Sequence, residues 1–466
     1  MALKIDYALT PEKLRSKVQR LFELSAAKIL ILEKSWQPSK GSPVFTVQGK
    51  YTSRGWTEWT QGFQFGSALL QFDATGDGEF LEIGRRGTRN VMAAHVSHVG
   101  VHDHGFNNIS TFGNLWRLMR EGRIPFNPGD KAFYELALKA SGAIQSARWT
   151  KTEEGKGFIY SFNGPHSLFV DTIRSLRSLA VAHQLGHVLM SECDQKISLL
   201  RRLLDHAELT ARFNIYYGEG RDIYDEPGRT AHEAIFNPIN GRFRCPSTQQ
   251  GFSPFSTWMR GLAWALLGFA EQLEFLCSLR TRIKFKTIPD FFARAAAATA
   301  DFYLANSCTD GIAMWDTMAP GLAHLGNYLQ KPADPFNRFE PVDSSAAAIA
   351  AQGFIRFGNF LKAEGDKTRG RRYRQAGLTL AATLLDEPYL STDVRHQGLL
   401  LHSVYHRPNG WDCVAPRQNV PNGESSIWGD YHLRELALMI LREIRKEPYM
   451  VFFDPGAKAA QEKERL

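Results

Sequence analysis

The sequence predicts an all-α protein whose helical hairpins form a ring. Apolar residues recur at helical spacing in most segments of the 466-residue chain, whereas strand-like alternation is limited to 44–49 and 157–162. No Pro/Ser-rich linker, low-complexity tract or fixed-period repeat divides the chain. We therefore expect a single domain over residues 1–466, with an N-terminal helical segment and a short C-terminal extension.

Helix boundaries follow from caps and periodicity. Pro11 opens a helix that runs to about residue 33, with Leu14, Val18 and Phe22 on its apolar stripe. Asn127 and Pro128 are typical of a helix cap followed by a first-turn proline. Further helices are expected at 167–190, 194–213, 256–279, 290–305, 344–362, 371–385 and 427–445. Long Gly/Pro/Asn-rich loops lie at 214–227, 237–254, 308–336 and 408–424, and loops of this length usually carry function.

The composition indicates a globular protein that favours anionic partners. Hydrophobic residues make up 43% and charged residues 22%, which excludes a disordered or collagen-like chain. The net charge of +8 favours nucleic acid, acidic polysaccharide or phosphometabolites, and the aromatic content of 12% suits a groove for ring-shaped ligands. The five cysteines form no CxxC pair, which argues against a disulfide framework or a zinc ribbon.

The sequence predicts a protein outside the membrane. Lys4 and Asp6 interrupt the N-terminus, which lacks the apolar core of a signal peptide. The longest apolar stretch, 261–276, contains Glu271 and Glu274 and falls short of the ~20 apolar residues of a membrane helix. We expect a cytoplasmic protein, or a periplasmic one if the chain has been trimmed, with no membrane or nucleic-acid partner. The sequence leaves the oligomeric state open.

The most unusual local composition lies at 94–106, where four histidines surround Asp103. His95, His98, His102 and His104 suggest a metal site, because histidine and aspartate are common zinc ligands. The segment lacks an HExxH spacing, however, and this favours a polar cleft wall in which Asp103 is an acid/base or accepts from a sugar hydroxyl. The chain also lacks a P-loop, a dinucleotide fingerprint and a serine-hydrolase elbow. We therefore expect no metal and no cofactor.

A second carboxylate, Asp171, follows the apolar run 168–170. It could be an ordinary acidic residue at a helix N-terminus, where the helix dipole favours it. The apolar run favours a different interpretation, because desolvation would raise the pKa of the carboxyl toward general-acid function. A third segment, 256–264, presents Trp258, Arg260 and Trp264. An indole offers a face for sugar C–H groups and a guanidinium offers a planar fork for a carboxylate, although core packing is the alternative for both tryptophans.

At these residues the sequence resembles the unsaturated glucuronyl hydrolases of glycoside hydrolase family 88, which are related to the unsaturated rhamnogalacturonyl hydrolases of family 105. The run Ser-Thr-Trp-x-Arg-Gly-x-Ala-Trp at 256–264 is the most specific part of the resemblance. In chain order, the matching patches are 59–63, 102–106, 169–172, 250–264, 314–316, 343–348, 400–405 and 427–431.

The resemblance implies an (α/α)6 toroid and an enzyme that hydrates the C4=C5 enol ether of an unsaturated uronate at the non-reducing end of an oligosaccharide. It implies that Asp171 is the general acid/base and Asp103 the second essential carboxylate. The sugar subsite would be lined by Trp59, His232, Gln250, Trp258, Arg260 and Trp264. We further expect the pKa of Asp171 to be raised, Asp103 to stay ionised, and Arg260 or another cation to neutralise the uronate carboxylate.

Two departures from the family pattern lie close to these residues. Leu262 stands where the family usually has a longer polar side chain, and Arg174-Ser175 stands where it usually has Met-Asn. An unsaturated rhamnogalacturonyl hydrolase and a non-catalytic toroid that binds acidic glycans are the alternatives. The pair Asp103 and Asp171 favours an enzyme, because a module that only binds an anion has no need of two carboxylates that repel it.

Overall fold

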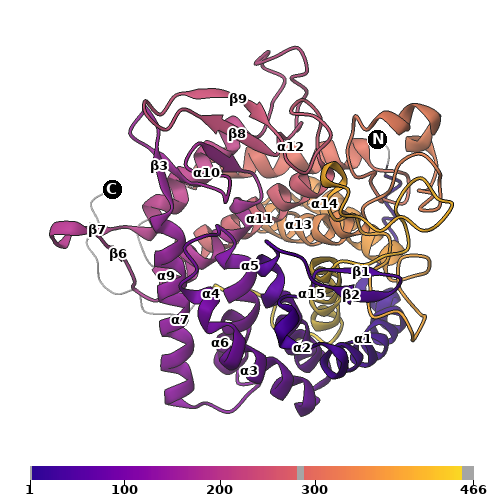
Figure 1. Ribbon diagram of the computed structural model, residues 1–466, viewed down its shortest axis with the longest axis horizontal. Helices are drawn as coiled ribbons and strands as arrows, with labels where there is room; N and C mark the ends of the chain where they lie inside the picture. The colour runs from indigo at the N-terminus through magenta and orange to yellow at the C-terminus, as the bar shows by residue number, and fades with distance from the viewer. Residues whose placement is uncertain (1–2, 281–287, 454–466) are drawn as a thin grey trace.

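The helices of the protein pair as inner and outer partners around a common centre (Figure 1). The structure is a computed structural model that describes residues 3–280 and 288–453. The inner helices are α2 (Gln61–Thr75), α5 (His104–Asn108) and α6 (Asn114–Arg120), α8 (Thr172–Ser175) and α9 (Arg177–Gln184), α11 (Met259–Arg280), α13 (Ser344–Ala363) and α15 (Ile427–Ile444). The outer helices are α1 (Arg15–Ser35), α3 (Gly78–Val91), α7 (Pro128–Ala147), α10 (Leu199–Phe213), α12 (Asp290–Asn306) and α14 (Lys367–Leu384).

Contacts between the inner helices close the ring. α15 packs on both α13 and α2, α2 contacts α5, α5 contacts α8, α8 packs on α11, and α11 packs on α13. A π-helical turn over Ile109–Gly113 joins α5 to α6, so that the two behave as one inner segment. This closed circuit of inner helices, each backed by an outer one, confirms the predicted (α/α)6 toroid.

Shorter elements complete the chain. One short helix, α4 (Ala93–Val96), precedes the histidine-rich segment. The 3₁₀ turns are η1 (Pro11–Leu14), η2 (Pro38–Lys40), η3 (Glu58–Thr60), η5 (Glu192–Asp194), η6 (Pro320–His324), η7 (Tyr328–Gln330) and η8 (Arg407–Asn409). As predicted, Asn127 caps α7 through its side chain, which accepts from the Asp130 amide, and Pro128 occupies the first turn.

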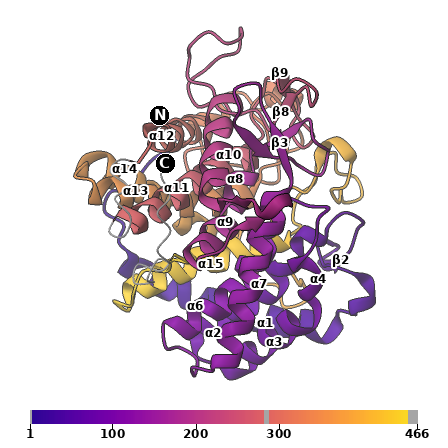
Figure 2. The ribbon, with the colours of Figure 1, turned by 90° about the vertical axis from the view of Figure 1, so that its left-hand side faces the viewer.

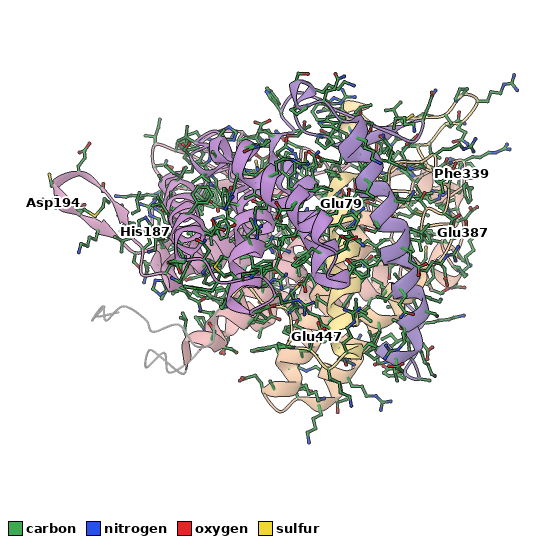
Figure 3. The ribbon with its side chains drawn as sticks, turned by 90° about the horizontal axis from the view of Figure 1, so that it is seen from below. Glu79, His187, Asp194, Phe339, Glu387 and Glu447 are labelled. Carbon is green, nitrogen blue, oxygen red and sulfur yellow. The ribbon has the colours of Figure 1, made fainter. Side chains whose placement is uncertain are left out.

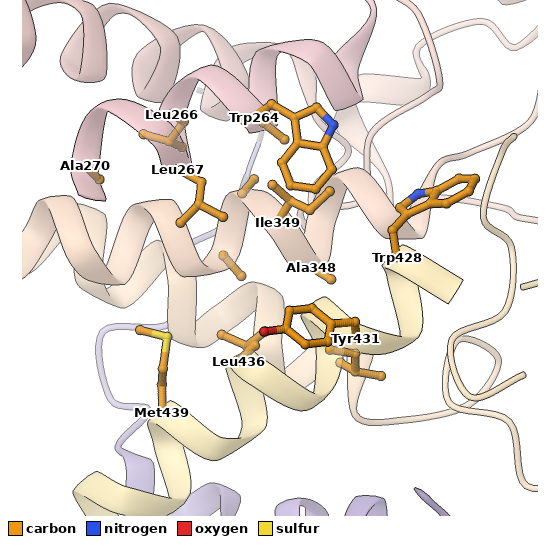
Figure 4. Close-up of a cluster of buried hydrophobic side chains, with 14 of the residues drawn as sticks. Trp264, Leu266, Leu267, Ala270, Ala348, Ile349, Trp428, Tyr431, Leu436 and Met439 are labelled. Carbon is orange, nitrogen blue, oxygen red and sulfur yellow. The ribbon is translucent and has the colours of Figure 1, made fainter. Parts of the chain in front are cut away.

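The core lies where α11, α13 and α15 meet. Leu267 of α11, Ile349 of α13 and Tyr431 of α15 are fully buried in this cluster of apolar side chains (Figure 4). α11 is long and apolar enough to be compared with a membrane span, but 83% of its most apolar stretch is buried inside the molecule. α11 is thus a core helix that is buried on nearly every side, even though it carries Arg260 and Glu271.

Short strands gather at one end of the helices, toward the right-hand side of Figure 2. A three-stranded antiparallel sheet places β8 (Glu233–Phe236) between β5 (Ser167–Phe169) and β9 (Phe243–Ser247). The remaining strands form antiparallel pairs: β1 (Phe45–Val47) with β2 (Lys50–Thr52), β3 (Trp149–Lys151) with β4 (Gly157–Ile159), and β6 (Leu189–Met190) with β7 (Lys196–Ile197). The β6–β7 hairpin projects from the body of the protein, with His187 near its base and Asp194 near its tip (Figure 3).

The predicted helix over 167–190 is wrong. Residues 167–169 form β5 instead, because they pair with β8 more than sixty residues later in the chain. The helical part is divided into α8 and α9, and residues 189–190 belong to β6. The predicted helix over 194–213 begins only at Leu199, where the Ser198 side chain caps α10 by accepting from the Arg201 amide. Strand pairing overrides local helical periodicity in both segments, through the distant partner β8 in the first and through the local β6–β7 hairpin in the second.

Candidate active site

A cavity of about 600 Å³ opens among the strands and loops at one end of the ring. It collects side chains from segments that are far apart in the sequence, as expected for a site in the loops of a helical ring. The predicted residues that line it are Trp59, Asp103, Asp171, Gln250, Trp258, Arg260 and Trp264. His232 lies just behind this lining, with its Nε2 atom 4.0 Å from Oδ2 of Asp171.

Strand pairing brings Asp171 and His232 together. β5 ends at Phe169, which lies opposite Glu233 of β8. The Val170 amide then donates to the His232 carbonyl, and the chain turns into α8 with Asp171 at its N-cap. Nδ1 of His232 accepts from the Gln249 amide at 3.0 Å, which leaves the proton on Nε2, the nitrogen that lies nearer Asp171.

The two predicted carboxylates meet at a single imidazole. Nε2 of His102 lies 3.2 Å from Oδ1 of Asp171 and 3.7 Å from Oδ1 of Asp103. All three side chains are at most 11% exposed. The His102 ring stacks on Phe162 at 6.2 Å and meets the edge of Phe169 at 5.6 Å, so apolar groups cover it where the carboxylates do not. The arrangement is a buried Asp–His–Asp cluster that can hold and pass a proton.

The cluster shifts the pKa values of the two carboxyls in opposite directions. Burial, partly offset by His102 and reinforced by the charge of Asp171, raises the pKa of Asp103 to about 6. Burial also disfavours the charged form of Asp171, but the hydrogen bond with His102 and the charges of His102, His232 and Arg260 outweigh it and lower the pKa. The expectation that Asp171 has a raised pKa is therefore wrong for the free protein, whereas Asp103, with a pKa of about 6, is still mostly ionised at neutral pH, as expected.

The two carboxyls favour the protonated form of His102. Burial opposes its charged form, yet the charge of Asp103 and the hydrogen bond to Asp171 raise the pKa of His102 above its ordinary value. The sequence indicated His102 only as part of a histidine-rich segment. Its partner Asp171 is 69 residues away in the chain, so no local pattern could identify the contact.

Arg260 lines the cavity, but acceptors inside the protein already occupy its terminal nitrogens. Nη1 donates to Oδ2 of Asp343 at 2.8 Å and to the Val404 carbonyl at 2.5 Å. Nη2 donates to Oε1 of Gln250 at 2.9 Å and to the Tyr405 carbonyl at 2.8 Å. The expected planar fork for a uronate carboxylate is therefore engaged within the protein. Arg260 fixes the Gln250 amide and the 404–405 backbone that form the cavity wall.

Stacked aromatic rings form the other walls. Trp59 stacks on Trp428 at 5.2 Å and Trp264 packs on Phe106 at 4.9 Å, so the predicted tryptophans are both partly core and partly cavity wall. The structure adds aromatic residues to the cavity wall that the sequence analysis did not assign to the site, namely Trp56, Phe162, Phe169, Tyr405 and Trp411. Trp411 lies in the long loop 408–424, and the length of this loop was the sequence feature that could have indicated a role for it.

The other histidines of the 94–106 segment have structural partners. Nδ1 of His104 pairs with Ser141 Oγ and its Nε2 pairs with the His98 carbonyl, while Nδ1 of His95 pairs with Asn107. Burial lowers the pKa of both His95 and His104 to about 4. Within residues 3–280 and 288–453, no group of three or more His, Cys, Asp or Glu side chains is placed to hold a metal ion.

Comparisons with known proteins agree with this geometry. No protein-family model matches the chain. An unsaturated glucuronyl hydrolase of Bacillus sp. strain GL1 is 25% identical over 409 residues, which cover 85% of this chain and 89% of that protein. An unsaturated chondroitin disaccharide hydrolase of Streptococcus agalactiae is 21% identical over 83% of this chain and 82% of its own. The chain is a relative of the unsaturated glucuronyl hydrolases.

Solved structures of unsaturated glucuronyl hydrolases have the same fold. The crystal structure of the enzyme from Bacillus sp. GL1 superposes with a TM-score of 0.70 at 21% identity, over 94% of this chain and all of that one. An unsaturated glucuronyl hydrolase described as specific for heparin gives a TM-score of 0.69 at 19% identity, over 92% and 98% of the two chains. The resemblance predicted from the sequence is confirmed.

Replacing Asp103 should stabilise the protein at neutral pH. The folded-state pKa of Asp103 is raised from 3.8 to about 6, so its ionised form costs stability above about pH 6 and nothing below pH 3.8. Asp103→Asn is therefore expected to raise the free energy of unfolding by about 1–3 kcal/mol at pH 7, and the gain should vanish near pH 4. Urea unfolding at the two pH values measures it.

Asp171→Asn is the matched control for this measurement. The pKa of Asp171 is lowered in the folded state, so its ionised form contributes stability at pH 7. That variant should lose stability at pH 7. Equal effects of the two substitutions would contradict the opposite pKa shifts of Asp103 and Asp171.

Proposed function

We propose that the protein removes the unsaturated uronic acid from the non-reducing end of lyase-generated oligosaccharides by hydrating its C4=C5 enol ether. The observation that carries the proposal is the Asp103–His102–Asp171 cluster buried in the wall of an aromatic-lined cavity. Enol-ether hydration needs one proton at C4 and one water at C5, and a carboxyl that gives and then regains a proton provides for both. Relatives named as chondroitin disaccharide hydrolases and a neighbour described as heparin-specific support oligosaccharides from glycosaminoglycans as the substrate class.

In the proposed reaction Asp171 delivers the proton. It takes the proton from Nε2 of His102, 3.2 Å away, when the anionic uronate binds and raises the pKa of Asp171. Protonation of C4 leaves positive charge at C5 that the ring oxygen shares, and the ionised partner carboxylate stabilises this charge. Water adds at C5 and loses its proton to Asp171. The resulting hemiketal collapses, the ring opens, and the neighbouring sugar leaves.

The cavity supports an anionic ring as ligand even though Arg260 is engaged. The net charge of +8 attracts acidic oligosaccharides over a distance. Inside the cavity, Trp59, Trp258 and Trp264 offer ring faces for sugar C–H groups. His232 presents an unpartnered buried Nε2 beside Asp171, a donor suited to a sugar oxygen.

A panel of lyase digests tests the proposal. The protein should abolish the absorbance of the C=C bond conjugated to the carboxylate, with unsaturated glycosaminoglycan disaccharides as the expected substrates and digested rhamnogalacturonan as the alternative. In deuterated water the product should carry deuterium at C4. Saturated glucuronides of the same linkage are the matched control and should remain intact. Release of a uronate that retains its double bond would mean cleavage at the anomeric carbon and would refute the mechanism.

A further inference from the structure

Three buried side chains outside the cavity wall form hydrogen bonds that hold the turn carrying Asp103. The His102 carbonyl accepts from Ser175 Oγ at 2.8 Å and from Gln145 Nε2 at 2.7 Å. Ser175 Oγ in turn accepts from the Gly105 amide at 2.9 Å and from Gln145 Nε2 at 2.9 Å. Ser178 Oγ donates to Oε1 of Gln145 and completes the network. Asp103 therefore lies between two anchored residues, one on each side.

The network is saturated and closed to solvent. Ser175, Gln145 and Ser178 are at most 1% exposed, and none of them lines the cavity. The Ser175 hydroxyl uses its one donor and both its acceptors, and both donors of the Gln145 amide are used. Fully satisfied buried networks of this kind restrict the groups they hold to one arrangement.

The backbone of the turn at Gly105 also packs closely against Ser175. A Cβ atom added at Gly105 would lie 2.1 Å from the Ser175 carbonyl oxygen, so only glycine allows the turn to approach α8 this closely. Ser175 ends α8, and Asp171 stands at the start of that one-turn helix. A single short helix thus carries one carboxylate at its beginning and the anchor for the other at its end.

We infer that Ser175, supported by Gln145, is a positioning residue that fixes Asp103 and His102 relative to Asp171. The inference rests on the proposed function and extends it to residues that do not touch the substrate. Ser175 is also one of the positions at which this sequence departs from the pattern that it resembles.

The anchor keeps Asp103 and His102 at fixed distances from the charged groups that shift their pKa values. Asp103 is faced by His102, Asp171, Arg148 and Glu58, and Asp171 is faced by His102, His232 and Arg260. The pairing of His102 with both carboxylates depends on distances of 3.2 and 3.7 Å. If the turn moves away, these interactions weaken steeply and the proton is held less tightly.

Ser175→Ala and Gln145→Met test the inference. Each removes part of the anchor without touching the cavity. Both should lower kcat by ~10- to 100-fold with KM within about threefold, because a small displacement of a reacting group costs rate rather than binding. The basic limb of the pH–rate profile should move to lower pH by about half a unit or more as the pKa of His102 falls toward its ordinary value.

Ser146→Ala is the matched control. Ser146 is equally buried on α7, but its hydroxyl donates only to the Ala143 carbonyl of its own helix. It should lower thermal stability without changing kcat or the pH profile. If Ser175→Ala and Gln145→Met behave like Ser146→Ala, the network serves packing alone and the inference is wrong.

An NMR titration of His102 separates this inference from the proposed function. The His102 imidazole signal, assigned by its loss in His102→Gln, should titrate at lower pH in Ser175→Ala than in the wild-type protein, with Ser146→Ala unchanged. This measurement needs no substrate. If no lyase product is turned over, the proposed function fails while the titration still decides the role of Ser175. An unchanged titration would refute the positioning role whatever the reaction.

Discussion

Asp171→Asn should lower kcat by about 10²–10⁴-fold and leave oligosaccharide binding within about threefold. The carboxamide keeps the size of the side chain, but it can neither give a proton to C4 nor take one from water. It also breaks the 3.2 Å contact with His102 as an ionic interaction. Loss of the conjugated chromophore measures turnover, and calorimetric titration of the inactive variant with an unsaturated disaccharide measures binding.

A surface carboxylate provides the control for this experiment. Asp301 is about half exposed and pairs with Arg372 on the outside of the ring. Asp301→Asn removes the same charge without touching the cavity and should retain wild-type turnover. Asp171→Asn that keeps a tenth of the wild-type kcat would show that another group protonates C4, and Asp103 would then be the next candidate.

Arg260→Met should lower the free energy of unfolding by about 3–5 kcal/mol, the largest stability effect expected for a residue of the cavity. The substitution leaves the fully buried Asp343 without its cationic partner, and it removes donors from the Gln250 side chain and two backbone carbonyls. The guanidinium also lies between two indole rings, 4.6 Å from Trp258 and 4.9 Å from Trp428. Chemical denaturation followed by far-UV circular dichroism measures the change.

A double variant separates the unpaired charge from the other losses. Arg260→Met combined with Asp343→Asn removes both charges and should recover a substantial part of the stability. Arg395→Met, which breaks the exposed pair with Asp393, should cost no more than about 1 kcal/mol. If Arg260→Met is as stable as the wild type but has a raised KM for unsaturated uronates, the result would instead support the direct contact with the substrate carboxylate that the sequence predicted.

The sequence predicted most of the long helices, including the deeply buried α11, and missed α2, α3, α5 and α6. α1, α7 and α12 to α15 show an apolar stripe or a cap at their first turn, so their positions follow from local rules. α2 is buried along nearly its whole length and shows no polar face to set its period. The strand at 167–169 was missed because its partner at 233–236 is invisible to a local pattern.

The candidate site was predictable as a set of residues but not as an electrostatic system. The motif resemblance brought together side chains that the structure also places in one cavity. The ionisation of Asp103 and Asp171 depends on His102, whose imidazole reaches Asp171 across 69 positions of the chain. The engagement of Arg260 likewise depends on Asp343 and on carbonyls 144 and 145 residues away. Such contacts are set by the tertiary fold.

The closure of the ring by α15 has a consequence for how the protein is made. α15 packs against α1, α2 and α13, and its Arg434 donates to Ser25 and Ser67 near the beginning of the chain. Until the ribosome has released α15, the nascent chain is an open arc whose apolar edges on α2 and α13 lack their partner. Contacts of such long sequence separation form slowly and leave hydrophobic surface exposed in the meantime. Shortened chains that lack α15 are therefore expected to aggregate rather than fold into a smaller ring, and efficient production should depend on chaperones that shield the open edges.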